Sequence, residues 1–309
     1  MNLEEDLNKS SRTKQSLLGF HSSRTGDWKK KFGYQMNPKY PIYIISKGRS
    51  KRCLTARELS AMKVPFILVI EPQEENQYRS VWPNANILTT PFSNLGQGSI
   101  PVRNFVWEHA LESGIKRHWI LDDNIEGFHR LHQNEKFKVG DGTIFRCCED
   151  FVDRFKNVPM AGMNYYSFCK KTDAVPPFYL NTRIYSCILL ENSREERWRG
   201  RYNEDTDLSI RLLKQGLCTI LFNSFLCGKV TTMRMGGGNT DEVYAETDNR
   251  REFAESLVRQ HPDVARMSFK FGRWHHHVDY KKFKNNRLIY ISEKPERKTN
   301  NYGMKLINT

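Results

Sequence analysis

Short apolar runs alternate with amphipathic stretches over the first half of the chain. The apolar runs are too short for helices but long enough for buried strands, and the amphipathic stretches have apolar positions at helical spacing. The strands are predicted at residues 41–45, 65–70, 87–88 and 118–121, and the helices at residues 55–62 and 100–114. This order predicts an α/β fold with a mixed, mostly parallel sheet flanked by helices.

The second half of the chain is less regular. It predicts a helix at 143–155, strands at 160–163 and 185–190, and a helix that begins at Asp205 or Asp207, whereas residues 128–141 are polar with isolated apolar positions. The chain is therefore divided into a polar basic arm (1–39), an α/β core (40–235) and a basic C-terminal extension (236–309). DNA binding is the function considered for the extension.

Two acidic residues directly follow the strand predicted at 118–121. Asp122 and Asp123 stand at its carboxyl end, and Asn124 comes next. In an α/β sheet, ligands bind beyond the carboxyl ends of the strands, so this strand would deliver two carboxylates to a site. Such oxygen ligands suit Mg²⁺ or Mn²⁺, which take the rest of their shell from water and substrate phosphate. The alternative for an isolated pair of acids is a polar turn.

A second acidic group precedes a predicted helix. Glu204, Asp205 and Asp207 lie within four positions of one another. Acids in the first turn of a helix interact favourably with its dipole, so capping is one explanation. One acid is enough for a cap, however, and a partly desolvated carboxylate here would be a candidate general base.

Several other groups are candidates for binding an anionic substrate. Arg103 and Asn104 lie near the amino terminus of a predicted helix, which is a natural anion site. Ser46 and Arg49 lie in the polar loop after the first strand, and Glu71 follows the second strand. These groups could converge on a nucleoside diphosphate, although a surface ion pair would equally explain each arginine.

The charge of the chain points to a polyanionic partner. Its 309 residues carry a net charge of +14, and residues 270–309 hold ten Lys and Arg against three Asp and Glu. Aromatic residues are interleaved with these charges, as in proteins that bind nucleic acid. Lys281, Lys282 and Lys284 are therefore expected to contact a DNA backbone. A solvated basic surface without a partner is the alternative.

The sequence argues against membrane and disulfide-rich classes. No apolar run approaches the ~20 residues needed to cross a bilayer, and the acidic residues 1–6 do not resemble a secretory signal. The seven cysteines form no CxxC pair, and Cys147 and Cys148 are adjacent. We therefore expect reduced thiols in a cytoplasmic protein with no membrane partner.

Two further motifs lie outside the acidic groups. Residues 236–238 are consecutive glycines, which fit either a flexible connector or a lid over a bound ligand. Residues 275–277 are consecutive histidines. Neighbouring side chains on a strand point in opposite directions, so at most His275 and His277 could share a site. His277 is retained as an additional metal ligand.

Four stretches of the chain resemble one family of enzymes. They are residues 41–49 (PIYIISKGR), 69–74 (VIEPQE), 98–109 (GSIPVRNFVWEH) and 118–125 (HWILDDNI). With Glu204 and Asp205 before a later helix, they are similar to the TET/JBP-associated glycosyltransferases, a phage-type family also found in some eukaryotic proteins. The resemblance implies a GT-A fold, a nucleotide-sugar donor and transfer to hydroxymethylated pyrimidines in DNA, such as 5-hydroxymethylcytosine. For a viral protein it implies the host-cell cytoplasm.

The resemblance also implies a role for each candidate residue. The donor, expected to be a UDP-sugar, would be bound by Ser46, Arg49, Glu71, Arg103, Asn104 and Asp122. A divalent metal, Mn²⁺ or Mg²⁺, would bind Asp123 and Asp122. Asp205 would act as general base on the acceptor hydroxyl. Glu204 would orient Asp205 or contact the acceptor. Because Asn124 occupies the third position of the acidic motif, the metal would depend on Asp123 and on phosphate oxygens.

Two other classes of protein fit the same residues. A metal-dependent nuclease or nucleotidyltransferase would hold two metal ions with Asp122, Asp123, Glu204 and Asp205. A non-catalytic DNA-binding module would keep the fold without binding a donor. Nicking of plasmid DNA by the protein with Mg²⁺ and no sugar donor would favour the first class, and the absence of donor binding would favour the second.

Overall fold

The computed structural model describes residues 36–200, 202–230, 250–270 and 272–291. Within these ranges, ten strands form one mixed sheet and two more form a hairpin. The strands of the sheet are β1 (Ile42–Ile45), β2 (Ile67–Ile70), β3 (Asn86–Thr89), β4 (Arg117–Asp122), β5 (Ile125–His132), β6 (Glu135–Lys138), β7 (Met160–Tyr165), β8 (Phe178–Leu180), β9 (Cys187–Glu191) and β10 (Thr219–Lys229). The hairpin consists of β11 (Ala265–Lys270) and β12 (Arg273–Val278).

The helices in the described ranges are α2 (Leu54–Ala61), α3 (Glu75–Val81), α4 (Ile100–Glu112), α5 (Thr143–Val152), α6 (Glu204–Lys214) and α8 (Arg250–Gln260). Short 3-10 turns are η1 (Ser50–Arg52), η2 (Pro72–Glu74) and η3 (Tyr280–Phe283). No helix among these described residues has the length and apolarity needed to span a membrane. All seven cysteines are free thiols, and six of them are buried.

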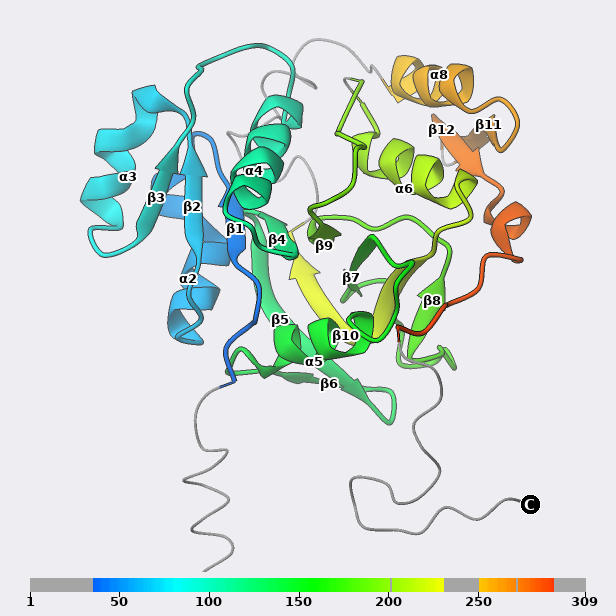
Figure 1. Ribbon diagram of the computed structural model, residues 1–309, viewed down its shortest axis with the longest axis horizontal. Coiled ribbons are helices and arrows are strands. Elements are labelled where there is room, and N and C mark those ends of the chain that lie inside the picture. Colours follow the sequence, from blue (N-terminus) through cyan, green and yellow to red (C-terminus); the bar gives the residue numbers. More distant parts are fainter. Residues whose placement is uncertain (1–35, 201, 231–249, 271, 292–309) are drawn as a thin grey trace, which may run out of the picture.

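The order of strands in the sheet is β3-β2-β1-β4-β9-β7-β10-β5-β6, with β8 beside β10 (Figure 1). β1 pairs in parallel with β2 and β4, and β2 with β3. β9 runs antiparallel between β4 and β7, and β10 is parallel to β7. The carboxyl ends of β1, β2, β4, β7 and β10 therefore lie at one edge, together with the amino end of β9. The predicted class, an α/β fold with a mixed sheet flanked by helices, is confirmed.

Alternation along β1 divides the core into two layers. Ile42 and Ile44 pack in a layer with α2, α3 and α5, whereas Tyr43 and Ile45 pack in a layer with α4 and α6. Successive side chains of a strand point to opposite faces, so a strand covered on both sides must be apolar at every position. Figure 1 shows α4 and α6 on one side of the sheet and α5 on the other.

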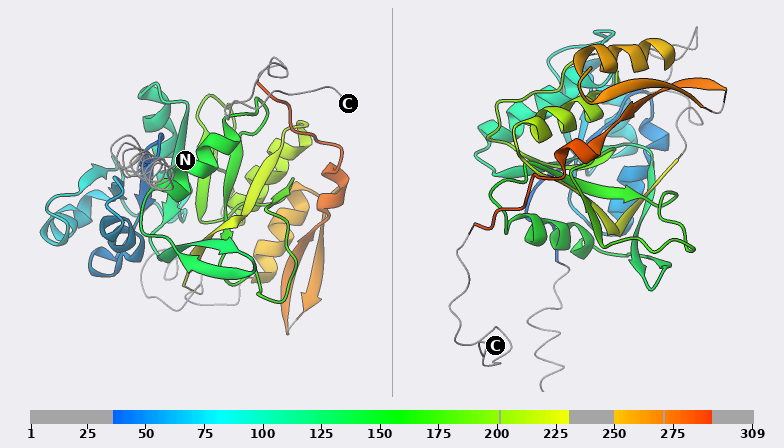
Figure 2. Two further views of the ribbon diagram at one scale, coloured as in Figure 1. Left: turned by 90° about the horizontal axis from the view of Figure 1, so that it is seen from below. Right: turned by 90° about the vertical axis from the view of Figure 1, so that its right-hand side faces the viewer.

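The described part of the C-terminal region packs against α6. Ile210 and Leu213 of α6 share a buried cluster with residues of α8, the hairpin and η3: Leu257, Val264, Ala265, Val278 and Phe283. The right-hand view of Figure 2 shows α8 and the hairpin beside α6. The glycines at 236–238 and the arm at 1–35 lie outside the described residues.

The structure adds strands where the sequence predicts none. β5 and β6 form an antiparallel pair within the polar stretch 128–141. β5 is half-exposed and β6 lies at the edge of the sheet, so neither carries the continuous apolar run of a strand that is covered on both faces. β10 has a register irregularity between Phe222 and Leu226, which interrupts its apolar pattern.

Candidate active site

The two acidic groups identified in the sequence meet at the sheet edge described above, and Arg103 connects them. Arg103 lies on α4 with 4% of its side chain exposed. Its Nη2 donates to Asp122 Oδ1 at 3.1 Å, while its Nη1 lies 3.8 Å from Asp205 Oδ1 and its Nε lies 3.8 Å from Glu204 Oε1. The end of β4 and the start of α6 therefore form one electrostatic cluster.

Asp122 is held between cations and a hydroxyl group. Besides the bond from Arg103, its Oδ2 accepts hydrogen bonds from Lys229 Nζ and Ser186 Oγ, each at 2.7 Å. Burial alone would raise the pKa of Asp122, but the nearby charges of Lys229 and Arg103 outweigh it and lower the pKa to about 2. Asp122 is therefore an ionised acceptor at neutral pH.

Asp123 has its own set of partners. Arg49 Nη1 donates to its Oδ1 at 2.6 Å, and Ser46 Oγ donates to its Oδ2 at 2.7 Å. The Tyr78 hydroxyl lies 2.7 Å from Ser46 Oγ and accepts from the Arg49 backbone amide at 3.2 Å. Burial raises the pKa of Asp123, and Arg49 opposes this effect. Three of the predicted donor and metal residues thus form one buried group.

These contacts do not match a metal site built from Asp122 and Asp123. All four carboxylate oxygens already accept hydrogen bonds, three of them from arginine or lysine side chains. A metal ion would have to displace those donors or be repelled by them. The part of the chain that the structure describes contains no group of three or more His, Cys, Asp and Glu that could hold a metal. The metal therefore remains a prediction, and no chemical step is assigned to it.

Asp205 differs from Asp122 and Asp123 because one of its oxygens has no hydrogen-bond donor among the described residues. Its Oδ1 is buried and, within the described residues, accepts no hydrogen bond. Burial raises the pKa of Asp205 to about 7; Arg103 lowers it, and the negative charges of Glu204 and Asp122 add to the increase. A carboxylate with a pKa near neutrality and a vacant acceptor has the properties of a general base.

The acids around Asp205 have different environments. Glu204 Oε1 accepts from Ser99 Oγ at 3.0 Å, which fixes it beside Arg103. Asp207 is fully buried and paired with Arg199, Arg211 and His261, at 3.0, 2.8 and 2.8 Å. These ion pairs explain Asp207 as a structural residue. The first turn of α6 therefore contains three acids. Asp207 is structural, whereas Glu204 and Asp205 face the site.

Two predicted donor residues have mainly local partners. Glu71, after β2, lies 3.3 Å from Lys47 Nζ and accepts from Gln73 and from the Asn94 backbone. Burial acts to raise the pKa of Glu71, but these donors lower it overall. The Asn104 amide exchanges two hydrogen bonds of 2.9 Å with the backbone of Trp198. Asn104 therefore holds the segment before α6, and its contact with a donor remains untested.

Lys229 and Ser186 belong to the site but are not identified from the sequence. Ser186 has a positive φ of 57°, in the left-handed region that is uncommon for residues other than glycine. The start of β9 lies so close to β7 that a Cβ on Gly162 would stand 2.3 Å from the Cys187 carbonyl oxygen. A glycine inside a strand is a sign of such a close approach, and it is the one signal in the sequence for this region.

The predicted DNA-binding lysines and His277 lie in the C-terminal region. Lys281, Lys282 and Lys284 are exposed, and the Lys282 ammonium donates to the Asp263 carbonyl oxygen. His277 is exposed on β12, opposite Arg266 of β11. It belongs to no potential metal-binding group among the described residues, so its role as a ligand gains no support.

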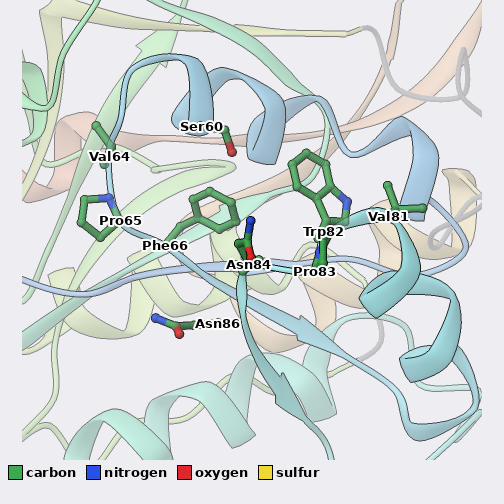
Figure 3. Close-up of a pocket in the computed structure, with 10 residues that line it drawn as sticks. Ser60, Val64, Pro65, Phe66, Val81, Trp82, Pro83, Asn84 and Asn86 are labelled. Carbon is green, nitrogen blue, oxygen red and sulfur yellow. The ribbon is translucent and has the colours of Figure 1, made fainter.

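A cavity of about 460 Å³ opens at the opposite edge of the sheet (Figure 3). It lies beside the amino ends of β2 and β3, and its lining includes Phe66, Trp82 and Asn86 but no ionisable side chain. Because acid–base and phosphate chemistry require charged groups, this cavity does not compete with the acidic cluster as the active site.

One family of known proteins matches most of the chain. No curated protein matches the chain. A crystal structure from Desulfovibrio desulfuricans G20, described as that of a nucleotide-diphospho-sugar transferase, is 10% identical with a TM-score of 0.38, and the match covers 73% of this chain and 96% of that one. The family described as TET-Associated Glycosyltransferase matches residues 40–238, a range that contains every acid of the cluster. The chain therefore belongs to the TET-associated glycosyltransferase family and is a glycosyltransferase.

Proposed function

We propose that this glycosyltransferase moves a sugar from a nucleotide-sugar donor, a UDP-sugar, to the hydroxyl group of a hydroxymethylated pyrimidine in DNA. The observation that carries the catalytic part of the proposal is the state of Asp205. Its Oδ1 is buried without a hydrogen-bond donor among the described residues, and its pKa is raised to about 7. An acceptor hydroxyl within ~3 Å of this oxygen would complete its hydrogen bonding and lose its proton to it.

The reaction exchanges one bond at the anomeric carbon of the sugar for another. The acceptor oxygen forms the new bond as its proton passes to Asp205. The bond from the anomeric carbon to the phosphate oxygen breaks, and its electron pair leaves with the nucleoside diphosphate. Preorganised positive charge stabilises such a leaving group. Arg103 and Lys229, which lie beside Asp122, are the residues proposed to supply it.

The proposed donor site lies along the ends of β1, β2 and β4. Asp122 is ionised and is proposed to accept from the ribose hydroxyls of the donor. Ser46 and Arg49 hold Asp123 beside it, and Glu71 stands at the end of the neighbouring strand β2. This arrangement follows the general rule that nucleotides bind beyond the carboxyl ends of strands.

The proposed acceptor is DNA because of the charge of the chain. The net charge is +14, and the exposed Lys281, Lys282 and Lys284 lie close together in the sequence. A base that reacts at an exocyclic hydroxyl must leave the stacked duplex, while basic side chains hold the backbone without reading its sequence. These charges support a polyanionic acceptor.

Mass spectrometry of nucleosides tests the proposal directly. DNA containing 5-hydroxymethylcytosine or 5-hydroxymethyluracil is incubated with the enzyme and a panel of sugar nucleotides, and the digested nucleosides are analysed. We expect a mass increase of one sugar on a hydroxymethylated base, none on cytosine or thymine, and none with Asp205→Asn. Transfer to a protein or a free sugar, with none to DNA, would refute the proposed acceptor.

The arrangement of the acids disfavours a two-metal nuclease. Such a site needs carboxylates that face two ions ~3.5–4 Å apart. Here the Arg103 guanidinium lies between Asp122 and Asp205 instead. Incubation of supercoiled plasmid with Mg²⁺ and no sugar nucleotide is expected to leave the plasmid intact.

A further inference from the structure

An aromatic cavity of about 210 Å³ lies next to the acidic cluster. Its walls come from the end of β7, the following loop, β8 and the segment before β9. The residues used below are Tyr165, Phe168, Tyr179, Thr182, Arg183 and Tyr185. The rings of Tyr165 and Tyr185 are nearly parallel, with centroids 6.1 Å apart and an interplanar angle of 25°. The exposed rings of Phe168 and Tyr179 complete the aromatic lining.

Both central tyrosines are linked to the catalytic groups. The Tyr185 hydroxyl lies 3.3 Å from Thr206 Oγ1, in the residue that follows Asp205. The Tyr165 hydroxyl lies 2.7 Å from Ser186 Oγ, which itself donates to Asp122. The cavity therefore adjoins the cluster on the side of α6 and β9, whereas the proposed donor residues Ser46, Arg49 and Glu71 lie at the ends of β1 and β2.

A basic groove continues from this cavity. The groove has a volume of about 670 Å³ and shares Tyr179 and Thr182 with the aromatic cavity. Lys281, Lys284 and Arg287 line it. Two of the lysines predicted to contact DNA thus line a depression that meets the aromatic cavity at Tyr179 and Thr182.

Arg183 stands in the wall of the aromatic cavity, and within the described residues its partners are tyrosines and no acid. Its guanidinium carbon lies 5.2 Å from the centre of the Tyr185 ring. The groups that act on its charge are tyrosines, chiefly Tyr185, and no described carboxylate is among them. A half-buried cation that no described carboxylate neutralises is suited to an anionic group of a ligand. Arginine binds phosphate well because its planar fork matches phosphate geometry.

We propose that the groove and the cavity form the path of the acceptor strand. The backbone of the DNA lies along Lys281, Lys284 and Arg287. One pyrimidine leaves the stack and enters the aromatic cavity, where its hydroxymethyl group faces Asp205 and Arg183 pairs with its phosphate. Aromatic side chains stack on bases of any sequence. This inference rests on the proposed function, because it assigns the acceptor site of the same reaction.

Photochemical cross-linking tests the location of the base without requiring catalysis. The probe is a single-stranded oligonucleotide with one 5-iodocytosine, irradiated at a saturating protein concentration and mapped by mass spectrometry after proteolysis. We expect cross-links in the peptides that contain Tyr165 and Phe168, or Tyr179 and Tyr185. Cross-links confined to the β11–β12 hairpin, no cross-links, or no binding of the oligonucleotide would overturn the proposal.

Competition by the donor separates two possible occupants of the cavity. If the cavity receives the acceptor base, UDP-glucose leaves the yield of these cross-links unchanged or increases it. If the cavity receives the sugar of the donor, UDP-glucose abolishes the cross-links, and the proposal is wrong.

Substitutions at the cavity provide a second measurement, the dissociation constant of the oligonucleotide from fluorescence anisotropy. We expect Arg183→Gln to weaken binding about tenfold, with partial recovery in Arg183→Lys, because the lysine keeps the charge but not the fork. Phe168→Ala removes a stacking face and should weaken binding by about fivefold or more. Phe137→Ala is the matched control, since Phe137 is 56% exposed and Phe168 54%, and Phe137 lies on β6 outside the cavity. Equal losses for both phenylalanines would contradict the proposal.

The cross-linking and the nucleoside analysis can fail independently. Cross-links in the cavity without sugar transfer to any DNA would support the cavity as a nucleobase site and refute the proposed reaction. Sugar transfer with cross-links elsewhere would support the reaction and refute this acceptor path.

Discussion

Lys229 Nζ lies 2.7 Å from Asp122 Oδ2, although 107 positions separate the two residues in the chain. Lys229 is the last residue of β10, and Asp122 is the last residue of β4. The two strands point in the same direction, with β9 and β7 between them, so their carboxyl ends reach the same edge. The contact lowers the pKa of Asp122 and raises that of Lys229, which keeps both groups charged.

Substitution of Asp205 is expected to separate catalysis from donor binding. Asp205→Asn removes the proposed base and should lower kcat by about 10²–10⁴-fold, with little change in the dissociation constant of UDP measured by calorimetry. In the wild type, transfer should increase with pH up to about 7 and then level off, because only the ionised carboxylate accepts a proton. A variant that transfers sugar at the wild-type rate would show that Asp205 is not the base.

The same substitution is expected to stabilise the folded protein. Burial raises the pKa of Asp205 from the ordinary value of 3.8 to about 7. Ionising Asp205 in the folded state therefore costs free energy and lowers the stability of the fold. This cost grows as the pH rises above 3.8 and reaches its full value above about 7. Asp205→Asn should increase the Tm more at about pH 8 than at about pH 5. Asp207→Asn, which breaks buried ion pairs, should decrease the Tm at both.

Thermal shifts with UDP and Mn²⁺ test whether a metal shares the donor site. A ligand that binds the folded state raises the Tm. We expect UDP to do so in the presence of a chelator, because Arg103 and Lys229 already supply positive charge beside Asp122. A combined shift from Mn²⁺ and UDP that exceeds the sum of the separate shifts would support the metal at Asp123 predicted from the sequence. Asp123→Asn should weaken UDP binding, since it removes the carboxylate that positions Arg49 and Ser46 in the proposed donor site.

Neutralising the exposed lysines of the C-terminal region is expected to weaken the binding of modified and unmodified DNA equally. The variant replaces Lys281, Lys282 and Lys284 together by glutamine. The loss of affinity should be similar for DNA with and without hydroxymethylcytosine, and the salt dependence should decrease by a slope of about 0.9 for each phosphate contact that is lost.

A control with the same loss of charge distinguishes local contacts from a general effect of net charge. Lys63, Lys116 and Lys156 are exposed and lie outside the basic groove. Their replacement by glutamine should leave the slope of the salt dependence nearly unchanged. Equal slopes for the two triple variants would mean that the lysines at 281–284 make no phosphate contacts.

The sequence is most informative where one short segment contains both a helix or strand and the charged side chains that it brings to the site. The apolar run before Asp122 and Asp123 predicts a buried strand that ends in acids, and the structure has it. Arg103 is likewise identified from its place in the first turn of a helix. In each case the local pattern and the chemical group lie within a few residues, so no knowledge of distant pairing is required.

The rest of the site depends on contacts between distant segments. Lys229 becomes part of it only because a long strand with an irregular register pairs with β7, and an interrupted apolar pattern does not predict such a strand. Ser186 points to Asp122 from a left-handed backbone conformation. The partners of Asp123 could not be foreseen either, and they change the expectation of a metal there.

The hydrogen bond between Asp207 and His261, at 2.8 Å, and the apolar cluster around Ile210 and Leu213 attach the C-terminal region to the helix that bears Asp205. An engineer who wished to redirect this enzyme to another acceptor by exchanging that region would alter the support of the proposed base at the same time. A chimera would have to retain the buried surface of α8 and η3, and only the outward-facing side chains could be redesigned freely.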